Sequence, residues 1–168
     1  MSIPAAYLGV VLIWSTTPIA IQWSGYDVNF LFGLGSRMMI SVTLLLLLLA
    51  LIGKSLPMHR RAWLTYLASG LGIYVAMSCV YWAASFIPSG WIAVIFGMTP
   101  IVTGVMANVW LEEKAFSPMK VLGLLLGLSG LGIMLINGGE MVQSGTFGIA
   151  LMSISVFFHS LSSVWVKR

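Results

Sequence analysis

Charged side chains are scarce in this chain, since only 7% of its 168 residues are Asp, Glu, Lys or Arg. Soluble domains carry about a quarter charged residues, so this scarcity excludes an ordinary soluble protein. The single cysteine, Cys79, excludes an intrachain disulfide. The two histidines, His59 and His159, are too few for desaturase-type metal chemistry. We therefore expect neither a metal site nor a cofactor.

Most of the sequence consists of long runs of apolar residues. Each run is close to the ~20 residues with which a helix crosses ~30 Å of hydrocarbon. Lipid cannot hydrogen-bond a bare backbone, so the runs must be helices packed together. The sequence predicts an all-α integral membrane protein, a multi-helix transmembrane bundle with six visible spans. They are Pro4–Ser24, Phe30–Ile52, Ala62–Ser85, Ser89–Leu111, Met119–Asn137 and Thr146–Val166.

The basic residues divide unevenly between the two sets of loops. With a cytoplasmic N-terminus, seven of the 8 Lys and Arg residues lie on the cytoplasmic side, and the outer loops hold only Asp27 and Glu140. This asymmetry predicts a multi-pass protein of the cell (inner or plasma) membrane with its N-terminus in the cytoplasm. It favours the lipid bilayer over nucleic acid as the partner of the net positive charge. The seven residues are Lys54, Arg60, Arg61, Lys114, Lys120, Lys167 and Arg168.

Two prolines interrupt predicted spans. Pro18 follows the hydroxyl residues Ser15, Thr16 and Thr17 midway along the first run, and Pro100 lies midway along the fourth. Proline frees a backbone carbonyl and bends a helix, and nearby hydroxyl groups can bond that carbonyl. Transporters place broken helices at a binding site near the middle of the membrane. Alternatively, the two prolines only shape the packing of the helices.

A polar stripe runs along the third span. Gly70, Tyr74, Ser78 and Tyr81 recur at helical spacing and share one face, which we expect to look into the bundle because polar groups are costly in lipid. There they either line a cavity or bond to neighbouring helices. Tyr74 and Trp14 lie near the middle of the membrane, away from the interfacial aromatic belt. Both are therefore candidates for cavity walls.

Few ionisable residues lie inside the spans, and none of them is acidic. Arg37, early in the second span, either reaches the outer lipid headgroups or points into a wet cavity toward an anionic group. His159 in the sixth span either couples a proton to transport or is a packing residue. Glu112 and Glu113 come only at the end of the fourth span. The absence of a buried carboxylate disfavours antiport of organic cations against protons.

Glycines repeat on one face of the fourth span and one face of the fifth. Small residues on a single face let two membrane helices approach closely, and they need no ligand to explain them. We therefore predict helix packing here and assign these residues no binding role. They are Gly90, Gly97 and Gly104 in the fourth span, and Gly123, Gly127 and Gly130 in the fifth.

Together, these features resemble a known family. Its pattern is matched by Arg37, by Tyr81-Trp82-Ala83-Ala84-Ser85 through Pro88-Ser89-Gly90, by Thr99-Pro100, by Leu111-Glu112-Glu113-Lys114 and by the glycine-rich stretch Gly123–Gly130. In this order and spacing they resemble the EamA-like domain of the drug/metabolite transporter superfamily. The resemblance covers nearly the whole chain. It implies ten helices built as two five-helix repeats of opposite orientation, with a substrate cavity between them.

The resemblance also divides the chain. Residues 1–138 would form the first five-helix repeat, and residues 146–168 the first helix of a second, truncated repeat. A shift of 145 residues sets Trp14–Thr17 opposite His159–Ser162, a weak self-match that is consistent with this division. Four of the ten expected helices are then missing, which suggests a fragment.

Three functions compete for such a chain. The first is a secondary transporter of small metabolites, an exporter of amino-acid-like or amphiphilic solutes that works by alternating access. The second is a non-transporting structural or assembly subunit, which could form a homo-dimer, or an inactive fragment. The third, a membrane-embedded enzyme, is disfavoured because Leu67-Ala68-Ser69-Gly70 lacks the first glycine of a rhomboid-type motif. The expected transporter cavity draws on Trp14, Ser15, Thr16, Arg37, Tyr74, Ser78, Tyr81 and His159, with helix kinks at Pro18 and Pro100.

The predicted orientation is testable by cysteine labelling of intact cells. In a Cys79→Ala background, Arg60→Cys should react with a membrane-impermeant maleimide only after the cells are permeabilised. Asp27→Cys, on the opposite side, should react without permeabilisation. Labelling of the Arg60→Cys protein in intact cells would contradict the orientation.

Overall fold

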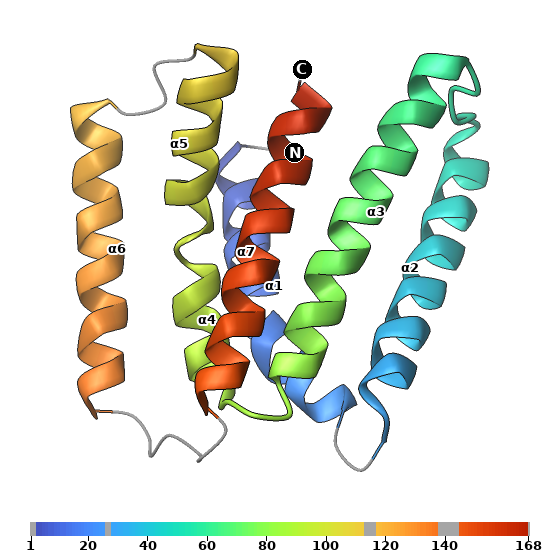
Figure 1. Cartoon of the computed structure of the whole chain (residues 1–168). Coiled ribbons are helices and arrows are strands. Elements are labelled where there is room, and N and C mark those ends of the chain that lie inside the picture. Colours follow the sequence, from blue (N-terminus) through green and yellow to red (C-terminus); the bar gives the residue numbers. More distant parts are fainter. Residues whose placement is uncertain (1–2, 26–27, 113–116, 138–144, 168) are drawn as a thin grey trace.

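The chain folds as an up-and-down bundle of helices (Figure 1). The computed structural model describes residues 3–25, 28–112, 117–137 and 145–167, without the side chains of residues 3, 131 and 134–137. Within these ranges there are helices and no strands. This confirms the all-α membrane bundle. The helices are α1 (Ile3–Ser24), α2 (Phe30–Ile52), α3 (Arg60–Ala83), α4 (Ser89–Phe96), α5 (Thr99–Leu111), α6 (Pro118–Asn137) and α7 (Gly145–Lys167).

Five candidate spans are long and apolar enough to cross a membrane, and α4 and α5 together form one of them. The remaining predicted span, Met119–Asn137, corresponds to α6, which is 20 residues long. The break between α4 and α5 falls at Gly97 and Met98, two residues before Pro100. Pro100 therefore lies in the first turn of α5. Its missing N–H costs nothing there, because the first N–H groups of a helix have no intrahelical partner.

Pro18 does not divide the first span into two helices, unlike the break in the fourth span. Helix α1 continues through Pro18. The hydroxyl groups of Ser15, Thr16 and Thr17 donate hydrogen bonds to the carbonyls of Leu12 and Ile13. Proline removes the bond to the carbonyl four residues earlier, which here is that of Trp14. In the described structure these hydroxyls therefore do not bond the freed carbonyl, because each of them bonds the carbonyl of Leu12 or Ile13 instead.

All described lysines and arginines except Arg37 gather at one end of the bundle, which we call the basic end. Helices α1, α3 and α6 begin at this end, and α2, α5 and α7 finish there (Figure 1). The cytoplasmic location of this end stays a prediction. The basic residues concerned are Lys54, Arg60, Arg61, Lys120 and Lys167. Tyr26, Asp27, Glu113, Lys114, Glu140 and Arg168 lie outside the described residues.

The opposite end, which we call the closed end, holds the packed core. The buried residues of this core lie near the C-terminal ends of α1 and α3 and near the N-terminal ends of α2, α4 and α7. None of them is more than about two and a half helical turns from such an end. Aromatic rings extend this packing, since Trp82 stacks on Phe30 and meets the edge of Phe147. The core cluster consists of Ile21, Leu34, Val80, Tyr81, Ala83, Ile87, Ile92, Leu151 and Met152.

Helix α7 is the most buried span and packs against both α3 and α5. Three of its serines make interhelical hydrogen bonds. Ser155 Oγ donates to Ala76 O at 2.8 Å, and Ser162 Oγ donates to Ser69 O at 3.3 Å. Thr103 Oγ1 of α5 donates to Ser160 Oγ at 3.0 Å. Such bonds contribute about 0.6 kcal/mol each on average between membrane helices. Together they anchor the rotation of α7 about its own axis.

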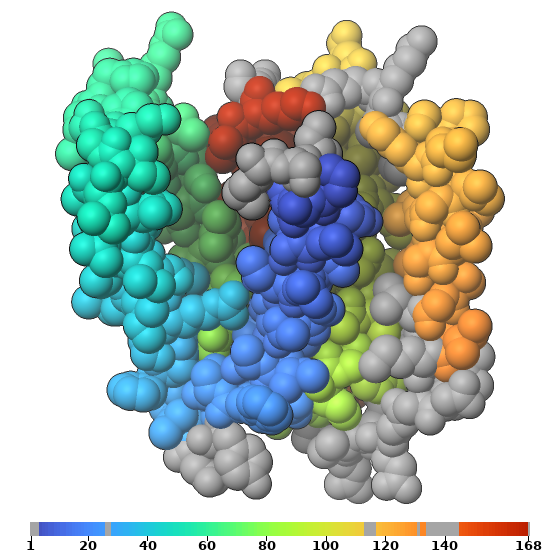
Figure 2. All heavy atoms as spheres, turned by 180° about the vertical axis from the view of Figure 1, so that it is seen from behind, coloured from blue at the N-terminus to red at the C-terminus, as the bar shows by residue number. Residues whose placement is uncertain are grey.

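The outer helices are packed more loosely. Figure 2 shows α1 over the middle of the rear face, with α2 at one edge and α6 at the other. The face of α6 formed by Gly123, Gly127 and Gly130 was predicted to pack against a helix. A methyl group added at any of these glycines would meet nothing within 4 Å. The predicted packing is therefore not formed in the described part of this chain.

The close approach of α7 to α3 gives a matched pair of substitutions. A Cβ added at Gly72 would lie 2.7 Å from the Ser162 Cβ, whereas one added at Gly70 would meet nothing within 4 Å. Gly72→Ala should therefore unfold more easily than Gly70→Ala by about 1–3 kcal/mol, the usual cost of overpacking. Both changes bring the same gain in helix propensity, so that gain cancels. The measurement is unfolding of the purified protein in mixed micelles, and equal stabilities would contradict the described α3–α7 contact.

Candidate functional site

A cavity of about 850 Å³ lies within the bundle, among helices α1, α2, α3, α4, α5 and α7. This volume falls within the range of small-molecule sites, about 300–1,000 Å³. It is lined by Ile13, Trp14, Ser15, Thr17, Pro18, Ile21, Arg37, Met77, Val80, Ile92, Ala93, Phe96, Gly97, Thr99, Pro100, Thr103, Gly104, Ala107, Leu111, His159, Ser163, Val164 and Lys167.

The cavity is asymmetric along the long axis of the bundle. Leu111 and Lys167, the last residues of α5 and α7, line it at the basic end. At its other limit the lining residues Ile21, Val80 and Ile92 are also members of the buried core. The cavity therefore reaches the basic end and has an apolar floor at the closed end.

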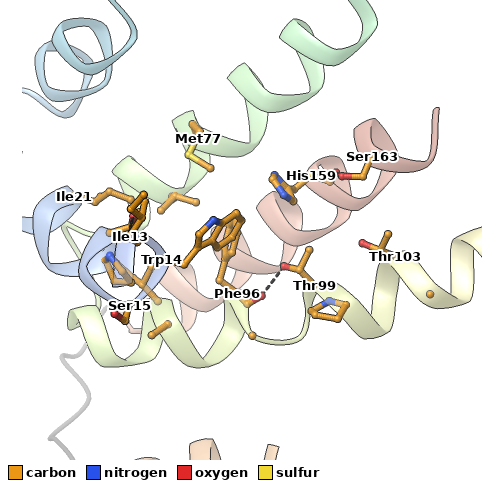
Figure 3. A pocket seen from close by; sticks show the side chains of 18 of the residues that line it. Ile13, Trp14, Ser15, Ile21, Met77, Phe96, Thr99, Thr103, His159 and Ser163 are labelled. Atoms are coloured by element: carbon orange, nitrogen blue, oxygen red, sulfur yellow. Dashed lines mark hydrogen bonds between the residues drawn. The ribbon is translucent and has the colours of Figure 1, made fainter. Parts of the chain in front are cut away.

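Three aromatic rings from three helices meet in this cavity (Figure 3). Phe96, the last residue of α4, contacts both Trp14 of α1 and His159 of α7. The ring centroids of Phe96 and His159 are 5.2 Å apart, and those of Trp14 and Phe96 are 6.0 Å apart. The Trp14 ring also meets that of His159 nearly edge-on, at 6.3 Å. We call these residues the ring trio; their spacing is typical of favourable aromatic pairs.

The His159 ring has an unused hydrogen-bonding nitrogen. Its Nδ1 is buried and has no hydrogen-bond partner in the described structure. A buried polar atom without a partner costs about 1–3 kcal/mol, so a solute that supplies a partner would recover part of that cost. The ring trio therefore combines apolar contact with one polar contact point.

Arg37 lines the same cavity, as the second of the two orientations predicted from the sequence requires. It is half-buried, and it makes no ion pair with any residue that the structure describes. None of the lining residues is acidic. The described ranges also contain no group of three or more His, Cys, Asp or Glu that could hold a metal ion. The site is thus cationic and aromatic.

The break in the fourth span forms one wall of the cavity. Gly97 and Thr99 both line it, and the Thr99 hydroxyl donates a hydrogen bond of 2.6 Å to Phe96 O across the break (Figure 3). This bond satisfies a carbonyl that α4 leaves free at its C-terminal end. Further along α5, Thr103 and Gly104 continue the wall. Gly97 and Gly104 had been assigned to packing alone, yet they lie at the cavity.

The structure brings together six of the ten residues predicted for the site. Those that line the cavity are Trp14, Ser15, Pro18, Arg37, Pro100 and His159. Thr16, Tyr74, Ser78 and Tyr81 do not line it. A role in binding substrate stays a prediction for all of them.

The polar stripe of α3 is divided between two environments. Tyr81 is 3% exposed in the core, whereas Tyr74 is 53% exposed and Gly70 is also exposed. The Ser78 hydroxyl bonds within its own helix, to Tyr74 O. The expectation that the whole stripe looks into the bundle was wrong, because α7 packs against the neighbouring face of α3, at Gly72 and Ala76.

Several lining residues were missed from the sequence. Met77 and Phe96 are ordinary apolar residues of spans, and Ser163 lies four residues after His159. A usable signal was present in α5, where Pro100, Gly104 and Ala107 recur at helical spacing as a face of small residues. Such a face leaves room for a cavity when no partner helix fills it.

Comparison with known proteins agrees with this architecture. The model of the EamA-like transporter family matches residues 2–136. Protein PagO of Salmonella typhimurium is 25% identical over 100% of this chain and 56% of its own length. The uncharacterized transporter YvbV of Bacillus subtilis is 28% identical over 95% of this chain and 52% of its own length. The chain thus spans about half the length of these relatives. No solved structure matches it significantly.

Thiol accessibility tests the cavity at two adjacent positions. In a Cys79→Ser background, Ser15→Cys should react with a charged, water-soluble thiol reagent, because Ser15 lines the cavity. Thr16→Cys should react at least tenfold more slowly, since Thr16 faces away from the cavity and lipid excludes charged reagents. The rates are measured by mass spectrometry in nanodiscs. Equal rates would contradict the described lining.

Proposed function

Because this chain belongs to the EamA-like transporter family, we propose that its cavity holds a small metabolite during transport across the membrane. A multi-pass membrane transporter of the drug/metabolite type is the coarse assignment. The finer proposal is a secondary transporter that exports amino-acid-like or amphiphilic solutes. It acts in the cell membrane with its N-terminus in the cytoplasm.

The observation that carries the proposal is the one-sided cavity. It reaches the basic end, and the apolar core closes the other end. A carrier that works by alternating access needs one state in which the cavity is open only at one end, and a second state in which it is open only at the other end. Because the basic end is predicted to be cytoplasmic, this state would load its solute from the cytoplasm, as an exporter does.

The proposed transport cycle opens the closed end while the basic end shuts. The break at Gly97 and Met98 divides the fourth span into α4, whose residues join the core, and α5, which lines the cavity. This interruption would let α4 move without α5. The apolar contacts of the floor would part first, and the ring trio would then shift because Phe96 ends α4.

The complete transporter would need more helices than these. The relatives are nearly twice as long as this chain, so a second repeat or a second copy of the chain would complete the cavity. Tyr74 and the open glycine face of α6 would then become available for contact with it.

A non-transporting membrane subunit is the second candidate. The observation that favours it is the face of α6 formed by Gly123, Gly127 and Gly130, which has no neighbour in the described structure. Small-residue faces of this kind drive association of membrane helices. A chain that associates through α6 and moves no solute would fit this function.

A transport assay with the purified protein in liposomes distinguishes the transporter from the non-transporting subunit. A solute that the protein carries should be moved at least tenfold less efficiently by Trp14→Ala, which removes one ring of the trio. Trp63→Ala is the matched control, because Trp63 is exposed and lies outside the cavity. It should transport normally. A protein that moves nothing from a broad panel of metabolites, or a Trp14→Ala protein with full activity, would contradict the proposed role of the cavity.

A further inference from the structure

We propose that the cavity selects solutes that carry an anionic group, with Arg37 as the counter-ion and the ring trio as the contact for an apolar body. The chemical class is a small amphiphilic organic acid, and organic cations are excluded. This inference rests on the proposed transport function and names the charge of its substrate.

The first support is the electrostatic position of Arg37. It lines the cavity, is half-buried and has no acidic partner among the described residues. The one described acidic residue, Glu112, does not line the cavity and follows α5 at the basic end. An arginine within a membrane span costs about 2.5–3.5 kcal/mol on insertion scales, and pairing with an opposite charge offsets that cost. A bound anion would supply the pairing that the chain itself lacks here.

The second support is the depth of Arg37. It lies seven residues after Phe30, where α2 begins, and Phe96 lies seven residues after Ser89, where α4 begins. Both helices begin at the closed end (Figure 1). At ~1.5 Å per residue, each residue is about 10 Å above that end. Arg37 and Phe96 therefore lie at the same depth, just above the floor of the cavity. Of the three rings of the trio, Phe96 is the one nearest to the closed end.

The third support is the chemistry of the remaining wall. Apart from the hydroxyl groups, His159 and Lys167, the lining is apolar and aromatic. An acid group beside Arg37 would leave the rest of the solute among Trp14, Phe96 and His159. A solute of this kind would also supply a partner to the buried His159 Nδ1 if it carries a second polar group.

An organic cation finds no matching site here. Its charge would need a carboxylate, and none lines the cavity. The faces of Trp14 and Phe96 offer cation–π attraction of about 0.5–2 kcal/mol, but Arg37 repels the same charge. Among solutes of equal apolar size, the anion should therefore bind most tightly and the cation least.

The test uses three solutes that share a phenyl ring and a four-carbon chain: 4-phenylbutyrate, 4-phenylbutanol and 4-phenylbutylamine. Binding to the purified chain in nanodiscs is measured by isothermal titration calorimetry. The anion should bind about tenfold more tightly than the alcohol, which corresponds to one charge-assisted contact. The amine should bind more weakly than the alcohol.

Variants assign the preference to Arg37. Arg37→Gln should bring the affinities of the anion and the alcohol to within about twofold of each other and leave that of the alcohol unchanged. Arg37→Lys should keep most of the preference, because it keeps the charge. Arg61→Gln, a change of an exposed arginine outside the cavity, should behave like the unchanged protein.

The ranking of the three solutes by the unchanged protein is decisive even if Arg37→Gln fails to fold. Equal affinities, or tightest binding of the amine, would overturn the inference while leaving the transport function in place. Absence of binding by all three would also overturn it. The liposome assay with Trp14→Ala then decides independently whether the transport function survives.

Discussion

The close contact of α7 with α3 is the constraint on which the rest of the architecture depends. Gly72 leaves the space that the Ser162 side chain fills, and the Ser155 hydroxyl bonds the backbone of Ala76. In lipid, packing and hydrogen bonds of this kind replace the hydrophobic effect as the force that joins helices. They fix the rotation of α7 about its axis. That rotation turns His159 and Ser163 toward the cavity and Ser160 toward Thr103 of α5.

The spans could be predicted because they follow from local properties of the sequence. A run of apolar residues of sufficient length must be helical in lipid whatever its neighbours are. The interruption near Pro100 was predictable for the same reason, since proline acts on its own helix. Arg37 and Trp14 were identified as site candidates from their chemistry and depth alone, and both line the cavity.

The orientation of each helix face could not be predicted, because it depends on which helices become neighbours. Tyr74 and Tyr81 share a stripe on α3, but the core at the closed end covers only Tyr81. The glycines of α6 carry a packing pattern, and the chain brings no helix against them. Phe96 carries no signal in the sequence at all. Its place in the ring trio results from the meeting of α1, α4 and α7.

The apolar floor also determines where the membrane voltage acts. A cavity that reaches one face of the membrane holds nearly the electrical potential of that face, so most of the potential difference falls across the thin layer of side chains around Ile21, Val80 and Ile92. A charged molecule lifted past this layer crosses most of the field in one short step. Each elementary charge then exchanges about 2.3 kcal/mol with a potential of 100 mV. The bundle thereby concentrates an electrical driving force on the roughly 10 Å of packed side chains between the cavity and the closed end.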